Sequence, residues 1–223
     1  MPIINMVYKK KKWWKPWANT IAYYPLTSNA NDYSWNWYNA TNNGGTFSEE
    51  NWWYFSEAYS RINLPSMSIW QTFTVSWWIK LPNWQPTWNQ EFNTYRDRSG
   101  PHRNLLFWAY ASWIRCLNGN NSTSSNSKTI SATFWTWWNN IVLSKSWTSY
   151  SVYMNWTLLE TFTAVHNVSI PWWNNTVQIP HDDAATSEYT APWYLKDLII
   201  ENKSRTAQEV SNYYNQTKSN YGL

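Results

Sequence analysis

The sequence predicts an all-β fold: a sandwich of two antiparallel sheets with one short helix at the C-terminus. Three observations predict it. Many short runs alternate apolar and polar residues, turn-like polar segments separate these runs, and one clear helix-start signal stands near the end of the chain. At 223 residues the chain can bury a full core within one domain.

The strand candidates follow one another at the short spacing that is typical of sandwiches. They are residues 20–26, 46–47, 54–55, 60–64, 73–80, 104–110, 114–117, 131–134, 140–144, 149–154, 157–162, 176–179 and 193–201. Residues 27–43 are predicted to be a polar loop. The segment 118–128 consists almost wholly of Asn, Ser, Thr and Gly, and is predicted to be a mobile loop.

The helix signal is the sequence Thr206-Ala-Gln-Glu209. In such a capping box, the Thr hydroxyl and the Glu carboxylate satisfy each other's backbone donors at the start of a helix. Val210, Tyr213 and Tyr214 then recur at helical spacing, so one face of the helix is expected to pack against the sandwich.

The positive charge lies mostly at the N-terminus. The net charge is +4, but five lysines, at positions 9–12 and 15, stand in the first twenty residues, which contain no acid. Without them 12 basic residues face 13 acidic ones, which predicts no specific nucleic-acid-binding surface. We interpret residues 1–19 as a basic flexible tail or linker and residues 20–223 as one sandwich domain. The alternative is that the lysines contact nucleic acid or an anionic surface.

Other classes of protein are disfavoured by what the chain lacks. Cys116 is the single cysteine, so neither an intramolecular disulfide nor a cysteine-based metal site is expected. The apolar start followed by lysines reverses the order of a signal peptide, and no apolar stretch approaches about 18 residues. No membrane insertion is predicted.

Tryptophan stands where turns normally carry glycine. The chain has 22 Trp and 5 Gly, roughly a third of the glycine that an average content of about 7% would give. Trp35 and Trp37 lie among Asp, Ser and Asn, Trp147 lies in a short polar connector, and Trp156 follows Asn155 between two strand candidates. In a left-handed turn a bulky residue costs about 1–2 kcal/mol.

We therefore hypothesise that many of these tryptophans are glycine in the natural protein. Some bacterial lineages and their phages read the UGA codon as glycine, and translation of UGA as tryptophan would leave this pattern. Trp78 and Trp138, at the edges of strand candidates, are interpreted as genuine aromatics. The alternative is a binding protein that is truly rich in tryptophan.

The order of the motifs resembles the laminin-G-like, concanavalin A-like jelly-roll family. Residues 21–26 with 29–38 are similar to its opening strand and Asp-x-Ser-Gly-Asn-Gly loop, with Trp35 and Trp37 in place of Gly. The other matching segments are 73–80, 138–144 with the hairpin 150–157, and 193–202 leading into 206–210. Asn140 stands where the family usually has His. The resemblance covers residues 20–217 and implies a two-sheet jelly roll.

This resemblance implies a binding module for glycans or proteins, which in some members holds a structural calcium ion. Calcium needs several oxygen ligands. Asp32, in the opening loop, and Asp197, in the closing strand, are the first carboxylates to consider, and Asp182 with Asp183 form a second candidate pair. The alternatives are turn capping by Asp32 and ordinary solvation of the adjacent pair.

The densest polar and aromatic cluster is the candidate glycan site. It comprises Tyr95, Arg96, Asp97, Arg98, His102 and Arg103. The alternative for this cluster is a charged surface loop.

Catalysis is not expected, because the chain has no Glu-x-Asp-x-x-Glu run of the kind glycosidases of this fold use, and its three histidines show no metal-ligand spacing. We therefore predict a non-enzymatic domain that binds a glycan or cell-surface polysaccharide. It is expected on a phage virion or tail, or at the bacterial cell surface, where other virion or surface proteins would be partners. The alternative is a structural or protein-interaction domain without a sugar site.

Overall fold

The computed structural model describes residues 18–48, 53–56, 61–65, 67, 69, 71–80, 103–110, 113–120, 124–163, 177–179 and 193–223. The predicted basic tail lies outside this part of the chain, apart from its last two residues. The elements are β1 (Thr20–Tyr24), β2 (Thr41–Asn43), β3 (Thr46–Ser48), β4 (Trp53–Ser56), β5 (Arg61–Leu64), β6 (Thr72–Lys80), β7 (Arg103–Tyr110), β8 (Trp113–Asn120), β9 (Ser124–Ser131), β10 (Trp138–Ser146), β11 (Ser149–Met154), β12 (Thr157–Thr163), β13 (Val177–Ile179), β14 (Trp193–Glu201), α1 (Ala207–Thr217) and the 3-10 helix η1 (Lys218–Tyr221).

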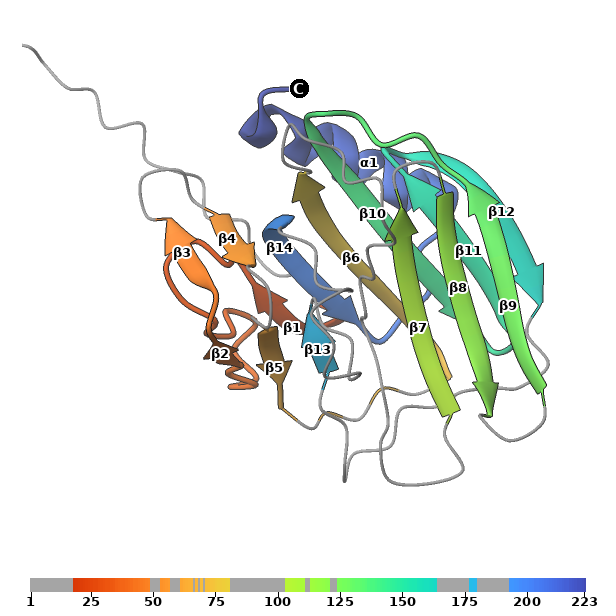
Figure 1. Ribbon diagram of the computed structural model, residues 1–223, viewed down its shortest axis with the longest axis horizontal. Helices are drawn as coiled ribbons and strands as arrows, with labels where there is room; N and C mark the ends of the chain where they lie inside the picture. The colour runs from red at the N-terminus through yellow and green to blue at the C-terminus, as the bar shows by residue number, and fades with distance from the viewer. Residues whose placement is uncertain are drawn as a thin grey trace, which may run out of the picture.

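One large antiparallel sheet forms the first layer. Its strand order is β12-β11-β10-β6-β14-β4-β3, and β1 also pairs with β14. Two three-stranded sheets, β13-β5-β2 and β7-β8-β9, form the second layer (Figure 1). The prediction of an all-β, two-layer antiparallel sandwich with a short C-terminal helix is confirmed, and the second layer consists of two separately hydrogen-bonded groups.

The core lies between the layers, and strand β6 shows how the sequence builds it. Phe73, Val75, Trp77 and Ile79 alternate along the strand and are buried on its inner face, as the two-residue period of a strand requires. The same apolar cluster contains residues of β5 and of β8 and β9, so all three sheets share one core.

The outer face of the large sheet is covered by the C-terminal helix, which lies behind the sheet in Figure 1. Trp78 points to this face and stacks on Tyr214 of α1, with 5.5 Å between ring centroids, and on Tyr221 of η1. Val210 packs in a separate cluster with Val142 and Tyr153. Because both faces of β6 are covered, consecutive residues Trp77 and Trp78 are both buried.

One loop prediction is wrong. Most of segment 118–128 is strand: β8 continues to Asn120, and β9 begins at Ser124 and pairs antiparallel with it, Asn118 opposite Asn126. Backbone hydrogen bonds hold such a pair whatever the polarity of the side chains, so composition alone misled. Two further predictions differ from the structure. Residues 132–134, predicted as strand, come after β9 has ended and are not strand, and the predicted loop 27–43 contains the short strand β2.

Within the part of the chain that the structure describes, no helix has both the length and the apolar character needed to cross a membrane.

Candidate functional site

The sequence-predicted site residues fall into two groups. Tyr95, Arg96, Asp97, Arg98, His102, Asp182 and Asp183 lie outside the described residues. Arg103 is the first residue of β7. Asp32 and Asp197 are described together with their contacts, so the geometry bears on these two carboxylates.

Asp32 organises the loop that follows β1. Its Oδ1 atom accepts hydrogen bonds from the backbone N–H of Tyr23 at 2.9 Å and of Ser34 at 2.8 Å. Its Oδ2 atom accepts from the Ser34 hydroxyl at 2.8 Å and from the Tyr38 backbone N–H at 3.0 Å. An Asp side chain that accepts from the backbone two residues later is a standard turn-forming group. The structure therefore shows Asp32 capping this turn.

The same loop is tied to β1 by Asn36, whose side-chain amide donates to the Ile21 carbonyl oxygen at 2.8 Å. The loop backbone is thus held by both Asp32 and Asn36, while Tyr38 packs against the core and three other aromatic side chains face outward. Tyr33, Trp35 and Trp37 are all exposed. In this sequence the loop presents an aromatic rim.

Asp197 lies at an irregularity in β14, where the pairing register with β6 shifts between Lys196 and Ile199. One carboxylate oxygen accepts from the Tyr23 hydroxyl at 2.8 Å, and the other accepts from the Tyr221 hydroxyl. Burial, reinforced by the negative charge of Asp197, raises the pKa of both phenols well above the ordinary value. Both phenols therefore stay neutral donors at physiological pH, and Asp197 joins β14 to β1 and η1.

The two carboxylates do not form one site. Asp32 accepts a hydrogen bond from the backbone N–H of Tyr23, whereas Asp197 accepts one from the hydroxyl at the far end of the Tyr23 side chain. Among the described residues, no three or more His, Cys, Asp or Glu side chains gather in a group that could hold a metal ion. Calcium binding by Asp32 or Asp197 stays a prediction, and it would have to compete with these hydrogen bonds.

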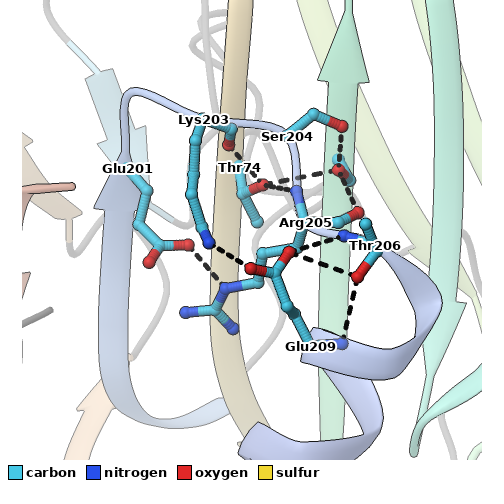
Figure 2. Close-up of polar contacts among 8 residues, drawn as sticks. Thr74, Glu201, Lys203, Ser204, Arg205, Thr206 and Glu209 are labelled. Carbon is cyan, nitrogen blue, oxygen red and sulfur yellow. Dashed lines mark hydrogen bonds and ion pairs between the residues drawn. The ribbon is translucent and has the colours of Figure 1, made fainter. Parts of the chain in front are cut away.

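A polar junction joins β14 to α1 (Figure 2). Glu201 and Arg205 form a fully buried ion pair, with 2.5 Å between Oε2 and Nε, and the guanidinium lies over the Tyr213 ring at 4.6 Å. Thr74 of β6 donates to the Lys203 carbonyl oxygen at 2.8 Å and accepts from the Arg205 backbone N–H at 3.0 Å. The junction fixes the chain as it leaves the sheet.

Sequence reasoning missed this junction. Glu201 and Arg205 are four residues apart, but the connector between strand and helix separates them, so no helical periodicity marks the pair. The capping box that follows was predicted, and its two reciprocal hydrogen bonds between Thr206 and Glu209 are present.

Comparison with known proteins gives similarity in structure without similarity in sequence. No protein-family model and no curated protein sequence matches the chain significantly. Among solved structures, the binding domain of Paraclostridial Mosquitocidal Protein 1 superposes with a TM-score of 0.70 at 13% identity, over 89% of this chain and 52% of that one. The botulinum neurotoxin serotype G binding domain gives 0.69 at 17% identity, over 90% and 52%.

A third similar structure is domain 4 of AbnA, an extracellular GH43 arabinanase from Geobacillus stearothermophilus, in complex with arabinotriose. It gives a TM-score of 0.64 at 15% identity, over 87% of this chain and 97% of that one. The chain therefore spans about half the length of the toxin binding domains and nearly the whole of the arabinanase domain. At these identities the similarity shows a shared β-sandwich fold.

Proposed function

We propose that the chain is a non-catalytic binding module that recognises a carbohydrate, as a free glycan or as a cell-surface polysaccharide. The observation that carries the proposal is structural similarity, at TM-scores of 0.64 to 0.70, to binding domains of toxins and to an arabinanase domain in complex with arabinotriose. Another similar structure, at 14% identity, is of botulinum neurotoxin type C, a toxin whose cell entry is dependent upon interaction with two ganglioside molecules. A fold alone does not fix a ligand, so the site needs its own test.

We assign the chain to the laminin-G-like, concanavalin A-like jelly-roll domains. The order of its motifs and its two-layer sandwich support this assignment. A place at a bacterial cell surface or on a phage virion or tail belongs to the same proposal. The extracellular arabinanase among the similar structures supports a place outside the cell, and the virion is the part of the proposal without a similar structure behind it.

The proposed sugar site is the segment from Tyr95 to Arg103, which leads directly into β7. Its chemistry suits a glycan, because an aromatic ring covers the apolar face of a sugar while charged side chains bond to its hydroxyls and fix its orientation. A bound calcium ion is a further part of the proposal. Asp182 and Asp183 are the ligands to test first, because the other two candidates, Asp32 and Asp197, already accept hydrogen bonds from the protein.

The experiment is binding to immobilised oligosaccharides that cover neutral, acidic and sialylated structures. The purified chain is compared with the double variant Arg96→Ala, Arg98→Ala and with Lys128→Ala, whose ammonium group makes a surface ion pair with Glu160 at 3.5 Å. We expect binding to a defined set of glycans, a loss of at least about tenfold in affinity for the double variant, from two charged hydrogen bonds, and unchanged affinity for Lys128→Ala.

A second candidate function is a structural or protein-interaction domain without a sugar site. It is favoured by the roles of Asp32 and Asp197, which both hold the fold together. Silence across all glycans, together with stable association with a virion or surface protein, would replace the first proposal by this one.

A further inference from the structure

Four tryptophans have backbone conformations of the left-handed region. Their φ angles are +77° at Trp35, +62° at Trp37, +55° at Trp147 and +67° at Trp156. Seven described residues other than glycine have positive φ, and four of the seven are tryptophan, although tryptophan supplies only 22 of 223 residues. For a bulky side chain such a φ is a genuine outlier, so this excess needs a cause.

The hairpin between β11 and β12 identifies the residue that fits. Its loop has two residues, Asn155 and Trp156, between the paired residues Met154 and Thr157. Both loop residues have positive φ, which is the pattern of a type I′ turn. That turn strongly prefers Asn-Gly.

The hairpin between β10 and β11 gives the same result with a different turn. Its loop is Trp147-Thr148, between the paired residues Ser146 and Ser149, and only the first of the two has positive φ. This is the pattern of a type II′ turn, which has glycine at its first central position. Two neighbouring hairpins thus each place tryptophan where the turn calls for glycine.

The indoles at these positions make few contacts that could offset the strain. Trp35, Trp37 and Trp147 are 81%, 80% and 64% exposed. Trp156 is 43% exposed and contacts the ring of Tyr214 at 4.4 Å between centroids. By contrast, the buried Trp77, Trp78 and Trp138 are absent from the positive-φ set. The three buried tryptophans and the four with positive φ thus occupy different kinds of position, core strands and turns.

Other residues with positive φ show what the fold accepts. Gly44 and Gly222, with φ of +86° and +76°, have the same conformation without strain. Asn155 and Asp197 belong to the residue types that visit this region most readily, and Leu26 is buried. Among the residues that the structure describes, only the four turn tryptophans combine a bulky side chain, a left-handed backbone and an exposed position.

We propose that positions 35, 37, 147 and 156 are glycine positions, and that the protein made in its natural source carries glycine there from UGA codons. With glycine, loop 32–38 reads Asp-Tyr-Ser-Gly-Asn-Gly-Tyr, and the loop of the hairpin between β11 and β12 reads Asn-Gly. The consequence for binding is that the natural surface has no indoles at these sites, so none of the four stacks on a ligand. Binding experiments are therefore run on the chain with tryptophan and on the chain with glycine at these positions.

The chain provides controls matched for exposure. Trp137 is 63% exposed, like Trp147, and Trp135 is 43% exposed, like Trp156, but neither control has positive φ. Trp147, Trp156 and the two controls are each changed to Gly in a separate variant, and the stability of each variant is measured by urea unfolding. Trp147→Gly and Trp156→Gly are expected to raise the folding equilibrium constant by roughly 5- to 30-fold per site. Trp137→Gly and Trp135→Gly are expected to leave it unchanged or lower it, because glycine adds freedom to the unfolded chain.

Alanine separates the backbone effect from loss of the indole. Trp147→Ala removes the indole but keeps the Cβ atom that makes positive φ unfavourable, so it should gain clearly less than Trp147→Gly. Equal gains for Ala and Gly, or equal gains at Trp137 and Trp147, would overturn the backbone argument. The occupant itself is measured by peptide mass spectrometry of the protein from its natural source: glycine at the four positions supports the proposal, and tryptophan there overturns it.

Discussion

At the scale of single residues, Asp197 and Asp32 illustrate how a carboxylate can look like a ligand in the sequence and act as a structural group. Asp197 accepts from phenols that lie 174 and 24 residues away along the chain. No local pattern predicts such partners, so its role could not be predicted from sequence. The role of Asp32 is local, and turn capping was one of its two predicted interpretations.

Replacement of Asp32 should loosen the loop after β1. Asp32→Ala leaves the backbone N–H groups of Tyr23, Ser34 and Tyr38 without their acceptor, and we expect a loss of about 1–3 kcal/mol in the free energy of unfolding. The control is Asn31→Ala, an exposed neighbour. Urea unfolding measures both, and equal stability of the two variants would refute the capping role.

At Asp197, two substitutions separate hydrogen bonding from backbone conformation. Asp197 has φ of +49°, which Asn tolerates better than Ala. Asp197→Asn keeps one carbonyl acceptor and should lose about 1–2 kcal/mol, whereas Asp197→Ala loses both acceptors and should cost more. If the alanine variant proved as stable as the wild type in thermal unfolding, the hydrogen bonds from Asp197 to β1 and η1 would not contribute to the free energy of unfolding.

The phenols around Asp197 predict an alkaline limit to stability. The pKa values of Tyr23, Tyr213 and Tyr221 are raised, first by burial and then by the charge of Asp197. A raised folded pKa gives stability that is complete below the unfolded value of about 10 and falls as pH rises above it. In an absorbance titration, their phenolate signal should appear together with loss of near-ultraviolet dichroism. Ionisation of all tyrosines near pH 10 in an intact fold would contradict this.

At the scale of elements, strands with alternating apolar residues were predicted most accurately. The predicted bounds 149–154 and 193–201 are those of β11 and β14, and prediction 73–80 misses only the first residue of β6. Strand β9 was missed because its Ser and Asn side chains carry no apolar signal. Of the candidate glycan segment, only Arg103, at the start of β7, lies within the described residues, so that site stays a prediction.

The helix start offers a prediction at the element scale. Thr206→Ala removes the acceptor for the Glu209 backbone N–H and should cost about 1 kcal/mol. The control, Gln208→Ala, lies in the same first turn and loses only an exposed hydrogen bond to Asn212. Urea unfolding of the two variants should differ, and a Thr206→Ala variant no less stable than Gln208→Ala would show that the cap contributes nothing.

Acid should weaken the same helix start. Hydrogen bonds hold the pKa of Glu209 below its usual value: the larger effect comes from the Lys203 side chain and the next from the Thr206 backbone N–H. A depressed folded pKa gives stability that is present above the unfolded pKa and is lost as pH falls through the folded one. The Glu209→Gln variant should therefore show a flatter loss of stability below about pH 4 than the wild type.

At the scale of the whole molecule, the chain forms a two-layer sandwich whose outer face is covered by the C-terminal helix. Its similarity to toxin binding domains extends over about half of their length, and its similarity to the arabinanase domain over nearly all of it. We propose that this sandwich binds carbohydrate.

Carbohydrate binding is tested by a quantitative screen of the folded chain, in its tryptophan and glycine forms, against a broad glycan array. We expect saturable binding to a related group of glycans. Binding by the glycine form would show that the four indoles are not required. If neither folded form binds any glycan saturably, carbohydrate binding is refuted and the protein-interaction function takes its place.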